Sequence, residues 1–174
     1  MRNCYCFPKI LQKFNTPSIS LAKAISEEVQ LNILSADMKR YWSIYPPSKL
    51  HDGYLNNFAH SYPESDGMWV RVYLKERVHV TKILVYNRAS CCQDRIVGPS
   101  VLIKSGNEYV TNCGGLNSAR MSYELHCSGE GDVVEISQAG AVGEWNLAEI
   151  RVYGKPIIGP KPGYLSKMLY RETG

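Results

Sequence analysis

From residue 69 onward the sequence follows a period of two, which is typical of β-strands and restricts the folds available to the chain. The first such segment reads Trp-Val-Arg-Val-Tyr-Leu over residues 69–74. Four more segments rich in β-branched or aromatic residues follow, at Val78–Tyr86, Ser100–Lys104, Asp132–Ser137 and Leu147–Tyr153. Clusters of Gly, Pro, Asn, Ser and Asp separate them, at residues 63–67, 98–99, 105–107, 114–117 and 129–131. No helical pattern lies between consecutive segments, so we expect an all-β, antiparallel sandwich or jelly roll and not parallel βαβ units.

The chain has 174 residues, enough for one domain with a proper core. We expect this domain to span residues 30–154, with an irregular N-terminal extension over residues 1–29 and a basic, proline-containing tail over residues 155–174. Within the extension, residues 18–29 have the spacing of a short helix. Residues 29–34 could equally open the first strand.

The net charge of +4 would fit a nucleic-acid-binding protein, but the excess of positive over negative charge comes from the two ends of the chain. The segment between the ends is slightly acidic, so we expect no nucleic-acid partner. No apolar run reaches the roughly 20 residues that a membrane-spanning helix needs. The N-terminus also lacks the apolar stretch of a secretory signal peptide.

Six cysteines offer several pairings, at positions 4, 6, 91, 92, 113 and 127. Cys91 and Cys92 could form a strained vicinal disulfide, or remain free thiols, or bond to separate partners. Cys113 and Cys127 could close a loop of about 15 residues, or remain two buried thiols. We expect Cys4 and Cys6 to be unstructured or intermolecular, because no nearby His supports a zinc site.

Arg88 and Arg95 flank the double cysteine. Two guanidinium groups beside an apolar disulfide would make a cradle for a polyol or an anion, although solvated surface arginines are the ordinary alternative. The four histidines have no nucleophile motif, metalloprotease motif or phosphate loop around them. We therefore do not expect an enzyme.

Residues Asn87–Gly98 (Asn-Arg-Ala-Ser-Cys-Cys-Gln-Asp-Arg-Ile-Val-Gly) resemble the Asn-Arg-x-Asp-Cys-Cys-x-x-Arg-Leu/Ile-x-Gly signature of the F-type lectins, or fucolectins. Three further segments are similar to those of the family and occur in the same order: Asp52-Gly53, His60 before the strand at 69–74, and Leu147–Gly154. The resemblance covers about residues 30–154. It implies a jelly-roll β-sandwich like that of galactose-binding and discoidin domains.

The resemblance also implies an oxidising, extracellular setting, with disulfides Cys91–Cys92 and Cys113–Cys127. A signal peptide would then lie upstream in a fuller chain, of which this sequence would be a fragment. In the family, one His and two Arg bind fucose and the vicinal disulfide packs against the sugar ring. Those roles fall on His60, Arg88, Arg95 and the Cys91–Cys92 pair.

The sequence departs from the family pattern at two places in the site. Ser90 stands where the family has an acid that would pair with the arginines. The site is then either weakened, or its extra positive charge suits a glycan with sulfate or carboxylate. In addition, Phe58 and Ala148 replace a pair of cysteines that many members join in a disulfide.

Calcium is also a feature of the family. Asp52 and Glu149 match its ligands and Asn57 could contribute, whereas Lys49 and Tyr54 replace expected oxygen donors. The resemblance thus predicts a lectin for fucosylated or anionic glycans, supported by Ca²⁺, in cell adhesion or innate immunity. Avidity through a homo-oligomer would be expected, because single lectin sites are weak. The alternative is a protein-interaction module on the same fold with a degenerate sugar site.

Overall fold

The computed structural model describes residues 27–157, which form one antiparallel β-sandwich with two short 3₁₀ helices. The predicted all-β jelly-roll class is confirmed. In chain order the elements are β1 (Val29–Gln30), β2 (Ile33–Met38), η1 (Pro47–His51), β3 (Ala59–His60), β4 (Gly67–Asn87), η2 (Gln93–Ile96), β5 (Ser100–Ser105), β6 (Glu108–Gly115), β7 (Ser122–Ala139) and β8 (Asn146–Pro156). No helix of this part of the chain is long and apolar enough to span a membrane.

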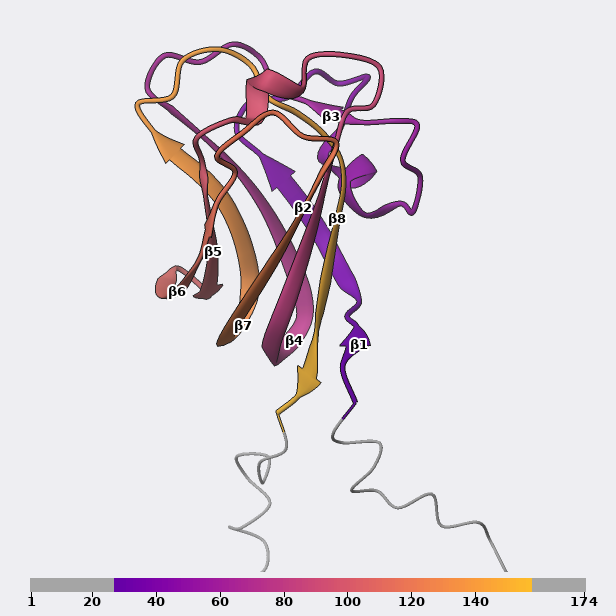
Figure 1. Cartoon of the computed structure of the whole chain (residues 1–174), viewed down its shortest axis with the longest axis vertical. Helices are drawn as coiled ribbons and strands as arrows, with labels where there is room; N and C mark the ends of the chain where they lie inside the picture. Colours follow the sequence, from indigo (N-terminus) through magenta and orange to yellow (C-terminus); the bar gives the residue numbers. More distant parts are fainter. Residues whose placement is uncertain (1–26, 158–174) are drawn as a thin grey trace, which may run out of the picture.

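The long strands β4 and β7 pair with each other along almost their whole length and bend together (Figure 1). Their register shifts between Tyr73 and Val78, opposite a stretch of β7 with two glycines, Gly129 and Gly131. The bend folds one hydrogen-bonded sheet, with strands in the order β1-β8-β4-β7-β5-β6, into two layers. Strand β2 pairs with β4 and strand β3 with β8, which completes the two edges.

The core lies between the two layers and contains the inward side chains of both halves of the bent strands. The alternation of residues at 69–74 places one side of the strand in this core. Val70 and Val72 are fully buried, whereas Arg71 and Tyr73 on the other face are only partly covered. Leu50 of η1 and Ile96 of η2 are also fully buried. These two side chains anchor the loops at one end of the sandwich to the core.

Strands predicted from the sequence lie within β4, β5, β7 and β8, but several elements were missed. Residues 29–34, read as a possible opening of the first strand, contain β1 and the start of β2, whereas β3, β6 and the first half of β7 were not predicted. The expected turn at 129–131 is wrong, since these residues lie within β7, where the strand bends without ending. The proposed helix at 18–29 lies almost wholly outside the described residues, and Val29 is in β1. Cys4, Cys6 and the tail beyond residue 157 also lie outside them.

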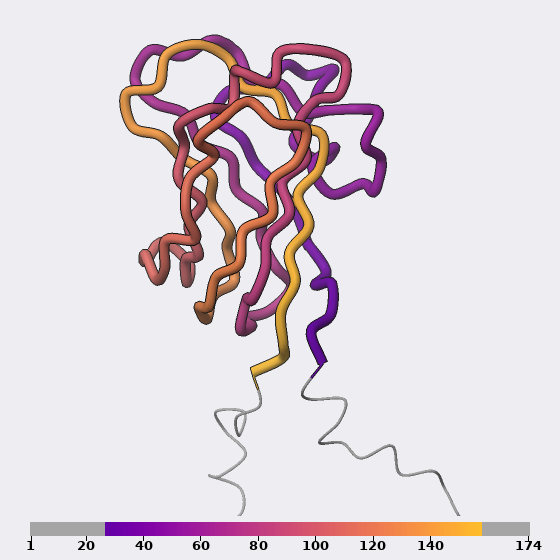
Figure 2. Tube along the Cα trace, in the orientation of Figure 1, coloured from indigo at the N-terminus to yellow at the C-terminus, as the bar shows by residue number. Residues whose placement is uncertain are grey.

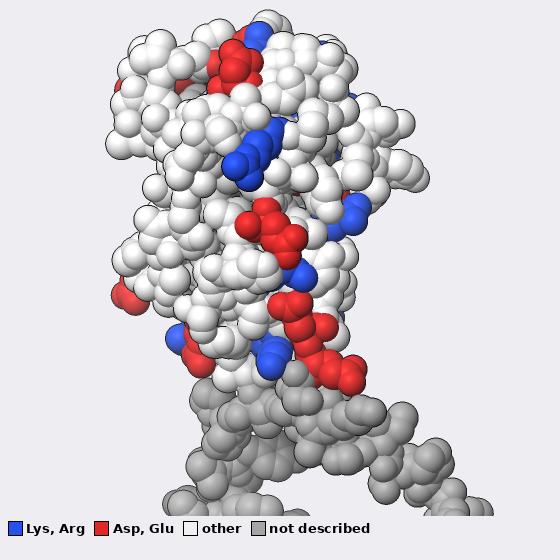
Figure 3. Space-filling model, in the orientation of Figure 1, with Lys and Arg blue, Asp and Glu red and all other residues white. Residues whose placement is uncertain are grey.

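The loops after β3, after β4 and before β8 gather at the end of the sandwich opposite the β4–β7 bend (Figure 2). Acidic and basic side chains alternate on the face drawn in Figure 3 and form no extended basic surface there. The predicted sugar-binding residues lie at this end of the sandwich, in the segment between β4 and β5 and at the end of β3.

Candidate functional site

The loop from Asn87 to Gly98 holds both arginines and the double cysteine. Asn87, which is buried at the end of β4, fixes its shape. Its side-chain Nδ2 donates to the carbonyls of Gln93 and Arg120, both at 3.0 Å, and its Oδ1 accepts from the amide of Arg88 at 2.8 Å. Gln93 in turn donates from Nε2 to the Arg88 carbonyl at 2.9 Å. The loop therefore presents its functional side chains from a hydrogen-bonded frame.

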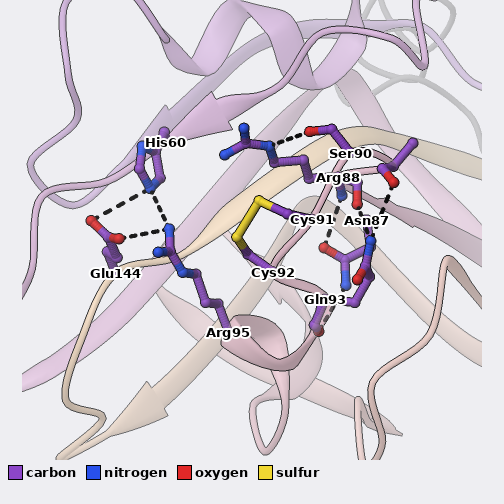
Figure 4. Close-up of a disulfide and its surroundings, with 10 residues drawn as sticks. His60, Asn87, Arg88, Ser90, Cys91, Cys92, Gln93, Arg95 and Glu144 are labelled. Atoms are coloured by element: carbon purple, nitrogen blue, oxygen red, sulfur yellow. Dashed lines mark hydrogen bonds and ion pairs between the residues drawn. A yellow bond between two sulfur atoms is a disulfide. The ribbon is translucent and has the colours of Figure 1, made fainter.

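Cys91 and Cys92 form a vicinal disulfide, and Cys113 and Cys127 form a second one between β6 and β7. Cys92 has a φ of 67°, a left-handed conformation that is uncommon outside glycine, and it starts helix η2. Figure 4 shows the vicinal disulfide between the side chains of Arg88 and Arg95. A small apolar plate thus lies between two cationic hydrogen-bond donors.

His60 at the end of β3 meets Arg95 and an acid that sequence reasoning did not identify, Glu144 (Figure 4). Arg95 Nη1 lies 3.1 Å from His60 Nε2 and 2.6 Å from Glu144 Oε1. The second carboxylate oxygen of Glu144 lies 3.5 Å from His60 Nε2. The only sequence signal for Glu144 was a glycine-containing loop before β8, which carries no motif.

Arg88 takes a different environment, without an acidic partner among residues 27–157. Its Nε donates to Ser90 Oγ at 2.8 Å, and its guanidinium carbon lies 3.9 Å from the centre of the Phe58 ring. Phe58 stacks on Tyr45 with ring centres 4.7 Å apart. The serine therefore keeps the hydrogen bond that the family's acid would accept, and an aromatic face covers the guanidinium.

The pKa of His60 lies below its ordinary value, because its ring is largely buried and the two arginines repel a further positive charge. Glu144 opposes this shift without cancelling it. His60 is therefore neutral at physiological pH and offers one ring nitrogen as donor and the other as acceptor.

Two hollows adjoin these residues. One, of about 280 Å³, is lined by residues 55–58 of the loop before β3 and residues 88–90. The other, of about 440 Å³, lies beyond Arg95 and is lined on its far side by Gln138 and the loop before β8. Both are partly open to solvent, and the hollow beside Arg88 is mainly apolar whereas the one beyond Arg95 is mainly polar.

The three predicted calcium ligands lie near one another, Asp52 and Asn57 between η1 and β3 and Glu149 in β8. Asp52 accepts from the Tyr54 amide at 3.0 Å and from Asn57 Nδ2 at 2.7 Å, and Glu149 accepts from the Gly53 amide at 3.2 Å. Burial raises the pKa of Glu149, although Gly53 and Arg151 donate to it and oppose the shift. Asn57 Oδ1 is buried and has no hydrogen-bond partner. This unpartnered oxygen and the carboxylates of Asp52 and Glu149 are donors of the kind that a hard cation prefers, with further oxygens needed to complete six to eight.

A family model described as NedA-like, galactose-binding domain matches residues 49–146 of this sequence. The chain belongs to this galactose-binding domain family. The match spans the segment from η1 to the start of β8, and so contains every residue of the predicted sugar site.

Comparisons with single proteins agree with the predicted F-type lectin resemblance, which is confirmed. The domain is 32% identical over 78 residues to Fucolectin-3 of Anguilla japonica, covering 43% of this chain and 42% of that protein. The chain spans less than half the length of the curated relatives it matches.

Solved structures show the same fold. A fucose-binding module of Streptococcus pneumoniae is 18% identical, with a TM-score of 0.65 over 75% of this chain and 98% of that one. A fucolectin from striped bass (Morone saxatilis) serum is 22% identical, with a TM-score of 0.59 over 71% and 46%.

Proposed function

We propose that this galactose-binding domain is a non-catalytic lectin that binds fucosylated or anionic glycans through His60, Arg88, Arg95 and the Cys91–Cys92 disulfide. The observation that carries the proposal is the convergence of two arginines and a neutral histidine on an apolar disulfide. Fucolectins and a fucose-binding module among the similar proteins support fucose as the first sugar to test.

The chemistry of a sugar ring suits these groups. Each sugar has hydroxyls around its edge and a carbon face that is largely apolar. Guanidinium groups donate to hydroxyl and ring oxygens, and a neutral imidazole can both donate and accept. The disulfide offers an apolar surface for the carbon face.

Calcium is the second part of the proposal. Asp52, Asn57 and Glu149 would hold the ion, with backbone carbonyls supplying the remaining ligands. The ion would neutralise two carboxylates and tie the loop after η1 to β8. It would support the shape of the sugar site and would not contact the sugar itself.

We further propose an extracellular protein, because its two disulfides persist only in an oxidising compartment. Adhesion or innate recognition of foreign glycans would suit such a lectin, and a homo-oligomer would raise its avidity.

A protein-interaction module on the same fold is the alternative function. Ser90 at the position of the family's acid favours it, because Arg88 then has no acidic partner among residues 27–157. Under this alternative the folded protein binds no glycan and uses another surface.

A broad glycan array with the disulfide-bonded protein, in calcium and again with a chelator, separates the two functions. Calcium-dependent binding to fucosylated or acidic glycans supports the lectin. No binding by protein with a cooperative melting transition and an intact Cys91–Cys92 bridge supports the interaction module.

A further inference from the structure

We propose that Glu144 determines the specificity of this site, so that its Arg95 side accepts an uncharged sugar hydroxyl and rejects a sulfate or carboxylate. The proposal rests on the lectin function above and narrows its substrate class.

Glu144 occupies the place where an anionic substituent would bind. Its two carboxylate oxygens face Arg95 Nη1 at 2.6 Å and His60 Nε2 at 3.5 Å. Charge-assisted hydrogen bonds of this length are among the stronger polar contacts in proteins. An anion directed at Arg95 would therefore have to displace a carboxylate that already neutralises it.

The backbone on both sides of Glu144 is held in place. Gly143 and Glu64 exchange two backbone hydrogen bonds of 2.9 and 2.8 Å. On the other side, Trp145 is 3% exposed, its amide donates to Ser61 Oγ at 2.8 Å, and its carbonyl accepts from the Ser61 amide at 3.0 Å. The backbone at Glu144 is thus held in place, and from this position its side chain reaches Arg95.

The charges around Arg95 strengthen the preference of this side of the site for an uncharged hydroxyl over an anion. His60 is neutral, so the site has two arginines and one carboxylate, and the carboxylate lies on the Arg95 side. Asp94 lines the adjacent hollow of about 440 Å³ together with Glu144. A negative substituent there would meet two like charges and one guanidinium.

A sugar hydroxyl can bind beside Glu144 where an anion cannot, because a hydroxyl both donates and accepts hydrogen bonds. It can donate to a carboxylate oxygen of Glu144 and accept from Arg95 without displacing either. Glu144 therefore neutralises the charge of Arg95. Arg88 is different, because its neighbour Ser90 carries no charge. Selection against charged analogues by an unfavourable like charge is a common route to specificity.

Isothermal titration with two probes tests the proposal: a neutral fucosylated trisaccharide, and the same trisaccharide with one sulfate on the residue next to fucose. The variants are Glu144→Gln, which keeps the size and an oxygen acceptor, and Glu144→Ala. The control is Glu130→Gln, which makes the same change in net charge at the β4–β7 bend, where Glu130 pairs with the exposed Arg77.

We expect the wild type to prefer the neutral probe by on the order of tenfold or more. Both Glu144 variants should reduce that ratio by about tenfold, and Glu130→Gln should leave it unchanged. A wild type without preference, or an unchanged ratio in folded Glu144 variants that still bind the neutral probe, would overturn the role of Glu144 alone. Binding of neither probe by any protein would overturn the lectin function as well.

Discussion

The guanidinium carbon of Arg88 lies 3.9 Å from the centre of the Phe58 ring. This contact joins the two departures from the F-type lectin pattern, since Phe58 stands at a family cysteine position and Ser90 at the family's acid. A cation over an aromatic face is stabilised electrostatically, by about 0.5–2 kcal/mol depending on exposure. The aromatic ring and the Ser90 hydroxyl thus orient Arg88, which has no acidic partner in the described part of the chain.

Phe58 is accordingly a positioning residue for Arg88. We predict that Phe58→Leu, which keeps an apolar side chain but removes the aromatic face, weakens sugar binding by about three- to tenfold. The fold should persist, because Phe58 is only partly buried. Titration calorimetry and a thermal melt on the same sample separate the two effects. Unchanged affinity would show that Arg88 needs no aromatic support.

The two disulfides should contribute differently. Replacing both Cys91 and Cys92 by Ser should reduce sugar affinity by tenfold or more, on the order of 1.4 kcal/mol, because the apolar plate is lost. Stability should change little in the entropy account, since the bridge closes almost no loop.

The matched control is the double serine variant of Cys113 and Cys127, whose bridge spans a sequence separation of 14. Its stability should fall by about 3 kcal/mol while sugar affinity is retained. Urea unfolding and calorimetry on both variants check the contrast. The reverse pattern would refute the separate roles.

Acid should destabilise the domain through His60. The pKa of His60 is lower in the folded chain than in the unfolded chain, mainly because of burial. As the pH falls through the ordinary histidine pKa, the unfolded chain therefore binds a proton at this residue more readily than the folded chain does. Stability from this residue is therefore complete at neutral pH and declines as pH falls through about 6.5, by at most about 1.4 kcal/mol per pH unit. Unfolding free energies measured between pH 7.5 and 5.5 should fall less steeply for His60→Gln. Equal slopes would contradict the assignment.

Calcium should stabilise the folded domain by mass action. At a hundredfold excess over its dissociation constant, the expected gain is about 2.7 kcal/mol. Differential scanning calorimetry should show a higher melting temperature in calcium than in chelator for the wild type, and a smaller difference for Asp52→Asn. A melting temperature that is the same in both conditions would argue against a calcium site at Asp52, Asn57 and Glu149.

Features that depend on a local residue pattern could be predicted from the sequence, whereas features that depend on contacts made in the folded chain could not. The period of two identified the strands of β4 and β8, and the double cysteine with its flanking arginines identified the loop of the site. The bend in β7 was read as a turn, because Gly129 and Gly131 are equally typical of both. Glu144 was missed because the loop before β8 comes close to His60 and Arg95 only in the folded chain, where β3 pairs with β8, and no local pattern reveals this.

The central claim is that Arg88 binds the sugar, and a comparison of Arg88→Ala with Arg77→Ala tests it most directly. Each variant removes one arginine, but Arg77 is an exposed residue at the β4–β7 bend. On a glycan array with calcium, the account predicts that Arg77→Ala binds the same glycans as the wild type and that Arg88→Ala, with an unchanged circular dichroism spectrum, binds none. Equal glycan binding by both variants would contradict the account.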